Sequence, residues 1–164
     1  MMTKYINVAI LLTLIIVLVV SGGCLSLKKK SSTATGDLKV NIDAHNASNL
    51  GSLELTLTYD PNVVKAVSVE KGSLAPNASL EYSVDKPGKV WLGMIDAGGI
   101  NGSGTLATVN LAITGSGDAS SAMNFEKVAA NRSTNLMEII TQNTPGNVRI
   151  KSKAVTNPFI TFTQ

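Results

Sequence analysis

Residues 53–59 alternate strictly between apolar and polar side chains, and this pattern limits the possible fold more than any other feature of the chain. The apolar positions would share one side of an extended strand: Leu53, Leu55, Leu57 and Tyr59. The other side would carry polar groups from Ser52, Glu54, Thr56 and Thr58. A period of two with one apolar side is typical of a β-strand that buries one face and leaves the other in water.

Further segments with strand-like composition follow this pattern through the rest of the chain. They are residues 38–43, 64–70, 79–84, 89–96, 105–114, 122–129, 136–141 and 147–150. Turn-forming glycine, proline and asparagine residues separate them, including the glycine-rich stretch 98–104. No segment has the period of an amphipathic helix. The sequence therefore predicts an all-β protein, a nine-stranded β-sandwich or jelly roll over residues 37–150.

The end of the chain leaves two readings open. Residues 151–164 follow the last strand of the predicted domain, and residues 159–162 combine aromatic and β-branched side chains. They form either an extra edge strand or a frayed C-terminal tail.

The N-terminal segment has the parts of a signal peptide. Lys4 precedes an apolar stretch at residues 6–20, and the small residues 21–23 follow it. Fifteen residues in a helix span about 22 Å, which is short for a hydrocarbon core of about 30 Å. We therefore expect a signal peptide over residues 1–23; the alternative is a retained transmembrane anchor.

Cys24 is the only cysteine and comes directly after two glycines. This junction resembles the lipobox of prokaryotic lipoproteins, which implies that Cys24 is the lipidated first residue of the mature chain. Residues 24–36 are rich in Ser, Thr and Lys and predict a flexible tether. We expect an exported protein anchored to the outer face of the cell membrane. An incidental thiol in a membrane helix is the alternative.

Composition excludes several other classes of protein. One cysteine and one histidine cannot form a disulfide framework or a zinc site of several Cys and His ligands. The net charge is +3, and the only dense basic run is residues 28–30, which gives no basic face for nucleic acid. Asp60 and Asp118 are interpreted as turn residues rather than calcium ligands. No metal or cofactor is expected on this chain.

The sequence also argues against an enzyme. His45 has no nucleophile on a strained turn as a partner, and we interpret it as a surface residue. Glu54 and Asp96 are the carboxylates closest to a pair, but a flat sheet face is a poor place to exclude water.

Four Asn-x-Ser sequons fall at expected strand ends or loops. They are Asn46, Asn77, Asn101 and Asn131. They are weak candidates for glycosylation of an exported protein.

Three segments together resemble cohesin modules. They are the run LELTLTYDPNVV at residues 53–64, VSVEKGSL at 67–74 and GSGTLA at 102–107. The resemblance spans residues 37–150. It implies a nine-stranded jelly-roll sandwich related to cellulose-binding modules, whose partner is a dockerin module. It also implies that calcium sits on the dockerin.

The same resemblance places the binding surface on the sheet that contains residues 53–59. It implies partner contacts at Ser52 and Glu54, on the face that also carries Thr56 and Thr58. For residues 89–96 we expect Trp91, Gly93 and Ile95 to point inward. The outward positions would then be Val90, Leu92, Met94 and Asp96, of which the last three would contact the partner. The alternative is that both sides of this strand are buried, so that Met94 belongs to the core.

The expected function is therefore that of a noncatalytic cell-surface docking module for a dockerin-bearing protein. A carbohydrate-binding or adhesive module of the same fold is the alternative, with polysaccharide as the partner. The small number of aromatic residues counts against this carbohydrate-binding alternative. Tyr59 and Trp91 are expected to point inward, which leaves only Tyr82 pointing outward. A structural envelope lipoprotein without a dockerin partner is a third possibility.

Overall fold

The structure is a computed structural model that describes residues 37–163. The predicted signal peptide at 1–23, Cys24 and the predicted tether at 24–36 lie outside the described residues.

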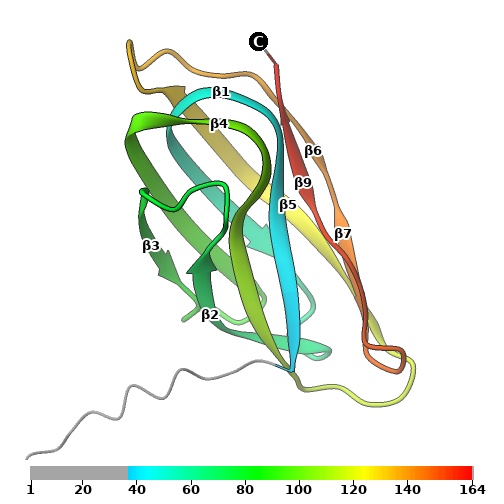
Figure 1. Cartoon of the computed structure of the whole chain (residues 1–164). Helices are drawn as coiled ribbons and strands as arrows, with labels where there is room; N and C mark the ends of the chain where they lie inside the picture. Colours follow the sequence, from blue (N-terminus) through cyan, green and yellow to red (C-terminus); the bar gives the residue numbers. More distant parts are fainter. Residues whose placement is uncertain (1–36, 164) are drawn as a thin grey trace, which may run out of the picture. The chain divides into compact units, whose positions relative to one another are not determined.

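Nine β-strands make up the described part of the chain (Figure 1). They are β1 (Leu38–Thr58), β2 (Val64–Lys71), β3 (Ser79–Ser83), β4 (Lys89–Ile113), β5 (Ser120–Arg132), β6 (Thr141–Thr144), β7 (Gly146–Arg149), β8 (Ala154–Thr156) and β9 (Phe159–Phe162). Residues 37–163 contain no helix, and hence none long and apolar enough to cross a membrane. The all-β prediction is confirmed.

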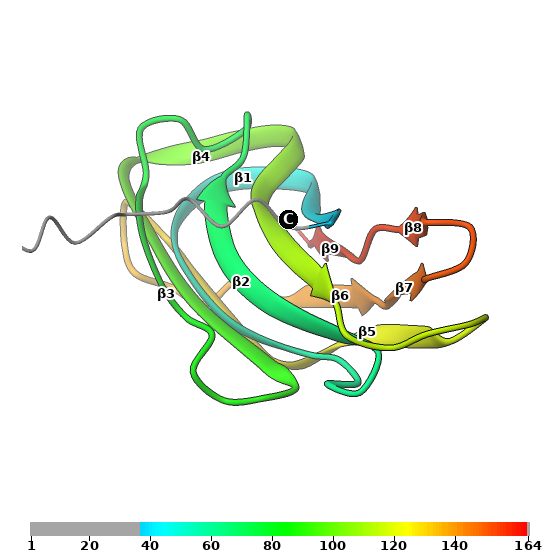
Figure 2. The same cartoon turned by 90° about the horizontal axis from the view of Figure 1, so that it is seen from below.

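Two long strands, β1 and β4, run through both layers of the fold. The layer that we call sheet I consists of β3, residues 89–95 of β4, residues 52–58 of β1 and residues 124–132 of β5. The layer that we call sheet II consists of β2, residues 104–113 of β4, residues 38–44 of β1, β9 and β6. In Figure 2, β2 and β3 lie on different layers. The strand β7 pairs with the start of β5, and β8 pairs with β7.

Both long strands bend where the backbone becomes left-handed. In β1, Asn46 and Asn49 have φ values of 57° and 56°, and the pairing register shifts around them. Asparagine and glycine tolerate this conformation better than other residues. In β4 the bend falls in residues 98–104, where Gly99 and Gly102 have positive φ. The prediction of a separating turn there was wrong, because the glycines bend one continuous strand.

The core lies between the two layers. The largest fully buried side chains come from both halves of β1 and β4 and from neighbouring strands: Ile42, Leu50, Leu55, Leu57, Leu92, Met94, Leu106, Leu111, Met123 and Ile160. Tyr59 is also buried, and its hydroxyl accepts a hydrogen bond of 3.1 Å from the N–H of Ala66. The predicted turn after Tyr59 is present, since Asp60 Oδ1 accepts the N–H of Asn62 at 2.9 Å.

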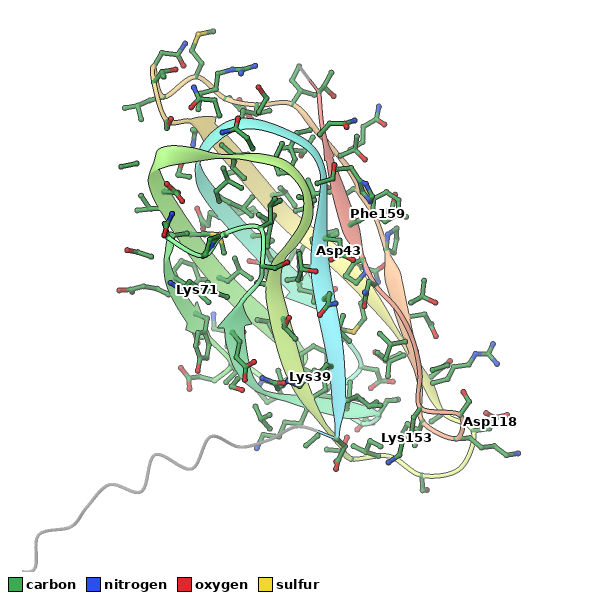
Figure 3. The ribbon with its side chains drawn as sticks, viewed as in Figure 1. Lys39, Asp43, Lys71, Asp118, Lys153 and Phe159 are labelled. Carbon is green, nitrogen blue, oxygen red and sulfur yellow. The ribbon has the colours of Figure 1, made fainter. Side chains whose placement is uncertain are left out.

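The C-terminal residues 159–162 form a strand and not a frayed tail. The strand β9 pairs in parallel with β1 and antiparallel with β6, and Ile160 and Phe162 are buried. The parallel pairing sets Asp43 opposite Phe159, as Figure 3 shows. Asn157 strengthens this junction with two hydrogen bonds. Its Nδ2 donates to Asp43 Oδ2 at 3.3 Å, and its Oδ1 accepts the N–H of Asn41 at 3.1 Å.

The strand predicted at residues 136–141 is largely absent. Only Glu138 forms an isolated bridge, with Asn131, and β6 begins at Thr141.

Candidate protein-binding face

The outer face of sheet I is defined by the register of its strands. From β1 it carries Ser52, Glu54, Thr56 and Thr58, and from β4 it carries Lys89, Trp91, Gly93 and Ile95. From β3 come Ser79, Glu81 and Ser83, and from β5 come Asn124, Lys127, Ala129 and Asn131. The four β1 residues are partly exposed, while the leucines between them are buried. Their predicted outward orientation is confirmed.

The predicted orientation of residues 89–96 was wrong. Leu92 and Met94 are only 1% exposed, whereas Trp91 is 37% and Ile95 65% exposed. The register explains the difference, since Leu92 lies opposite Leu55 and Met94 opposite Leu53. Paired residues in an antiparallel sheet share a side, so both belong to the buried row.

Leu92 and Met94 therefore do not lie on a surface that a partner can reach, and Met94 belongs to the core. The alternative that both sides of this strand are buried is wrong, because Trp91 and Ile95 are exposed. Asp96, also expected to face the partner, lies beyond the β1–β4 rows of the outer face. Its Oδ1 accepts the N–H of Gly98 at 2.9 Å, so it supports the bend of β4.

A hydrogen-bonded group at the centre of the face joins three strands. The indole Nε1 of Trp91 donates to Oε1 of Glu54 at 3.1 Å. The ammonium group of Lys127 donates to the same oxygen at 2.8 Å. These two hydrogen bonds hold the pKa of Glu54 below its ordinary value of 4.5, and the one from Lys127 has the larger effect. Desolvation of the carboxylate acts in the opposite direction and raises the pKa. The carboxylate therefore stays charged at neutral pH and fixes the orientation of the indole.

Gly93 supplies the space in which the indole lies. A Cβ atom at this position would come within 3.2–3.3 Å of two ring atoms of Trp91. The indole therefore rests against the bare backbone of Gly93, with its position set by this contact and by Glu54. A partner would meet an aromatic ring that is already ordered, which lowers the entropy cost of binding.

Shallow depressions flank the indole on both sides. One is a groove of about 460 Å³ lined by residues including Ser52, Gly93, Ile95 and Ala129. The other is a hollow of about 320 Å³ beside Thr56, Ser83 and Lys86. Lys89 and Glu126 form an ion pair of 2.6 Å at its border. A polar surface with an aromatic centre and two small hollows suits side chains projecting from a folded partner.

The other candidate residues lie apart from this group. His45 is exposed in the sheet II half of β1 and packs edge-on against Phe159, with ring centroids 4.8 Å apart. Within residues 37–163, no three His, Cys, Asp or Glu side chains come together as a metal site would require.

The sequons occupy different surfaces. Asn46, Asn77 and Asn101 are exposed. Asn131 is half-buried on the outer face of sheet I, where its amide donates to Ser52 Oγ at 3.3 Å. Glycosylation stays a prediction at all four.

Sequence reasoning missed Trp91, Ile95 and Lys127 as members of this face. Trp91 and Ile95 were assigned to the core because the resemblance to cohesins placed Met94 and Asp96 on the outward side of the strand. Lys127 lies 73 positions from Glu54, and no local pattern connects the two. No local signal separated the two sides of this strand, because residues 90–95 are apolar on both.

The Cohesin domain family matches residues 24–150. The chain belongs to the cohesin family. Among curated proteins no relative matches.

Solved structures show the same fold at low sequence identity. A non-cellulosomal cohesin from Archaeoglobus fulgidus has 23% identity and a TM-score of 0.55, covering 78% of this chain and 80% of that one. The sixth cohesin of scaffoldin B from Acetivibrio cellulolyticus, in complex with the Cel5 dockerin, has 16% identity and a TM-score of 0.53, covering 77% and 96%. A cohesin–dockerin complex from Clostridium thermocellum, Coh-OlpC-Doc435, has 18% identity and a TM-score of 0.51, covering 78% of this chain and 95% of that one. The predicted jelly-roll sandwich is confirmed.

Proposed function

We propose that this chain is a noncatalytic docking module that binds a dockerin-bearing protein through the outer face of sheet I. Membership of the cohesin family supports a docking role, and several similar structures are complexes with dockerins. The observation that carries the choice of face is the ordered indole of Trp91, fixed between Glu54 and Gly93 at its centre.

The chemistry of the face suits a helical protein partner. Trp91 and Ile95 offer exposed apolar surface, and tryptophan is among the residues that most often dominate interface energies. Around them, Ser52, Thr56 and Asn131 offer hydroxyl and amide groups that can exchange hydrogen bonds with a partner. An apolar centre with a polar surround is the usual anatomy of a protein interface.

The location of the module is part of the same proposal. A lipid on Cys24 would anchor the chain to the outer face of the cell membrane, and residues 24–36 would separate the domain from it. The module would then hold its partner near the cell surface. Calcium would belong to the dockerin, and this chain would need no cofactor.

A carbohydrate-binding role is the second candidate, and one observation favours it. Trp91 is exposed beside a shallow groove, where an indole could stack on a sugar ring. Within residues 37–163, the other exposed residue among the tyrosines and phenylalanines is Tyr82. It is paired with buried Leu92, so it does not continue an aromatic row on the outer face. A structural envelope lipoprotein without a dockerin partner is the third candidate.

Calorimetry with the full-length chain in detergent micelles separates these candidates. The chain is titrated with calcium-loaded dockerins, chosen by selecting a surface-displayed dockerin library against it, and separately with soluble cellulose and chitin fragments. We expect dockerin binding that Trp91→Ala weakens by about 2 kcal/mol or more. His45→Ala, an exposed ring on the other layer, is the matched control and should bind like wild type.

Each outcome decides between the candidates. Sugar binding that depends on Trp91, together with a library that yields no dockerin binding the chain, would favour the carbohydrate role and refute docking. Binding to neither class would favour the structural role.

A further inference from the structure

We propose that the partner contact continues past β5 onto an apolar flank formed by Leu136, Met137 and Ile140, which receives apolar side chains of a basic amphipathic helix of the dockerin. This inference rests on the proposed docking function and deepens it.

Backbone hydrogen bonds make the flank a continuation of sheet I. The N–H of Arg132 donates to the carbonyl of Met137 at 2.9 Å, and the N–H of Ile139 donates to the carbonyl of Ala130 at 2.8 Å. Asn131 and Glu138 form an antiparallel bridge between them. Continuing this register sets Ile140 beside Ala129. Since Ala129 lies opposite Glu54, Ile140 is on the outer side of the sheet, as is Glu138 beside Asn131. Met137 lies beside Arg132 and has the opposite orientation, although it is also exposed to solvent.

Exposed apolar side chains concentrate on this side of the domain. Within residues 37–163, the large apolar residues that remain exposed are Tyr82, Trp91, Ile95, Leu136, Met137 and Ile140. All except Tyr82 belong to the outer face or to the flank. The three flank residues are 77%, 63% and 71% exposed. A local gathering of exposed apolar groups with a polar surround marks an interaction surface.

The flank is held in place by its own polar contacts. Asn49, at the bend of β1, accepts the N–H of Ser133 on its carbonyl at 2.9 Å and donates its amide to Thr134 Oγ1 at 2.8 Å. Asn135 Oδ1 accepts the N–H of Met137 at 3.1 Å. These bonds support the tip of the loop between β5 and β6, which lies at the upper end of the domain in Figure 1. The apolar side chains are thus presented to solvent by an ordered backbone.

The spacing of the apolar groups fits an α-helix lying across the strands. Ile95 on β4 lies in the row of Ser52 and Asn131, and Ile140 on the flank lies one row along, in that of Glu54 and Ala129. Three inter-strand intervals and a two-residue offset along the strands separate them by about 16 Å. On one side of a helix, residues about seven to eleven positions apart are about 10–16 Å apart. One helix that crosses the strands obliquely can therefore contact both residues.

Charge indicates which helix would fit. Glu138 on the flank and Glu81 on β3 are both exposed, and they lie at opposite ends of the rows that such a helix would cross. Lysine or arginine residues on either side of an apolar stripe would complement them. The occupant is therefore a basic amphipathic helix rather than an acidic or uncharged one.

The test measures dissociation constants of the full-length chain in detergent micelles, with calcium-loaded dockerins selected from a displayed library. Ile140→Ser should weaken binding about tenfold without changing the melting temperature, and Met137→Ser, whose side chain has the opposite orientation, should weaken it less. Tyr82→Ser removes the exposed apolar residue outside the proposed surface and should change the affinity less than about twofold. Glu138→Gln should weaken binding and reduce its dependence on salt.

Hydrogen exchange of the wild-type chain gives a readout without any substitution. Residues 136–140 should become protected when the dockerin binds, together with residues 91–95. Unchanged affinity in Ile140→Ser, or no protection at 136–140, would overturn this inference while the docking function stands. If the displayed library yields no dockerin that binds the wild-type chain, both proposals are overturned.

Discussion

Trp91 and Glu54 are joined across two neighbouring strands by a hydrogen bond of 3.1 Å from the indole Nε1 to Oε1 of the carboxylate. The same oxygen accepts a hydrogen bond from Lys127 on the next strand. A single carboxylate oxygen thus ties together β4, β1 and β5 at the middle of the outer face. The group orders the largest exposed side chain of this face before any partner arrives.

The first prediction uses Trp91 as a reporter, because it is the only tryptophan in the chain. A partner that covers the half-exposed indole should shift its emission to shorter wavelength, since the ring moves into less polar surroundings. Titration with a fluorescence-silent dockerin should show the shift in wild type, and Trp91→Phe should show no signal. Binding detected by calorimetry without any change in emission would place the partner elsewhere.

The second prediction distinguishes the two sides of β4. Met94→Ala removes a fully buried side chain and should lower the free energy of unfolding by about 2–5 kcal/mol. Ile95→Ala, one position along the strand, removes an exposed side chain and should change it by less than about 0.5 kcal/mol. Urea denaturation of both variants measures this contrast. Equal effects would mean that the strand does not alternate as described.

This contrast also shows what the sequence could predict. Residues 53–59 were oriented correctly because their polar and apolar positions alternate without exception. Residues 90–95 read Val-Trp-Leu-Gly-Met-Ile, which is apolar on both sides, so alternation alone could not decide. Only pairing with the buried leucines of β1 fixes the side that faces the core.

Long-range pairing explains the rest of what was missed. The bend that lets β1 cross between layers depends on the left-handed backbone of Asn46 and Asn49, and the β4 pairing follows from it. The contact between Glu54 and Lys127 depends on the pairing of β1 with β5, which sets Lys127 opposite Thr56 and so diagonally across from Glu54. Such bends and long-range pairings leave no periodic signal in one sequence, so the strands were predictable but not the group that they assemble.

The third prediction concerns the C-terminal strands. Deleting residues 151–164 removes β8 and β9, including the buried side chains of Ile160 and Phe162. The free energy of unfolding should fall by more than the 2–5 kcal/mol of a single large core truncation, because β1 and β6 also lose their pairing partner. Thermal melting monitored by circular dichroism tests this. Deleting Gln164 alone is the control, and equal melting of both chains would contradict the role of β9.

The fourth prediction tests the anchor. Cys24→Ser removes the thiol on which the proposed lipid would be carried. The variant should therefore leave the membrane fraction or accumulate as an unprocessed precursor. Fractionation and electrophoretic mobility measure both outcomes, with Ser26→Ala as a neighbouring control. A variant that fractionates and migrates like wild type would favour a retained transmembrane anchor instead.

The fifth prediction concerns the pH dependence of the group around Glu54. Its pKa in the folded chain is below the ordinary value of 4.5, because Lys127 and Trp91 donate hydrogen bonds to the charged form. A carboxyl group of this kind stabilises the folded state above its unfolded pKa and loses that contribution as the pH falls through the folded pKa. The emission of Trp91 should therefore change on acidification with a midpoint below 4.5. In Lys127→Met the midpoint should rise, because the hydrogen bond that lowers the pKa of Glu54 most is gone. Glu54→Gln removes the titrating group and should abolish the transition, and a transition that persists in this variant would assign the titration to another carboxyl group.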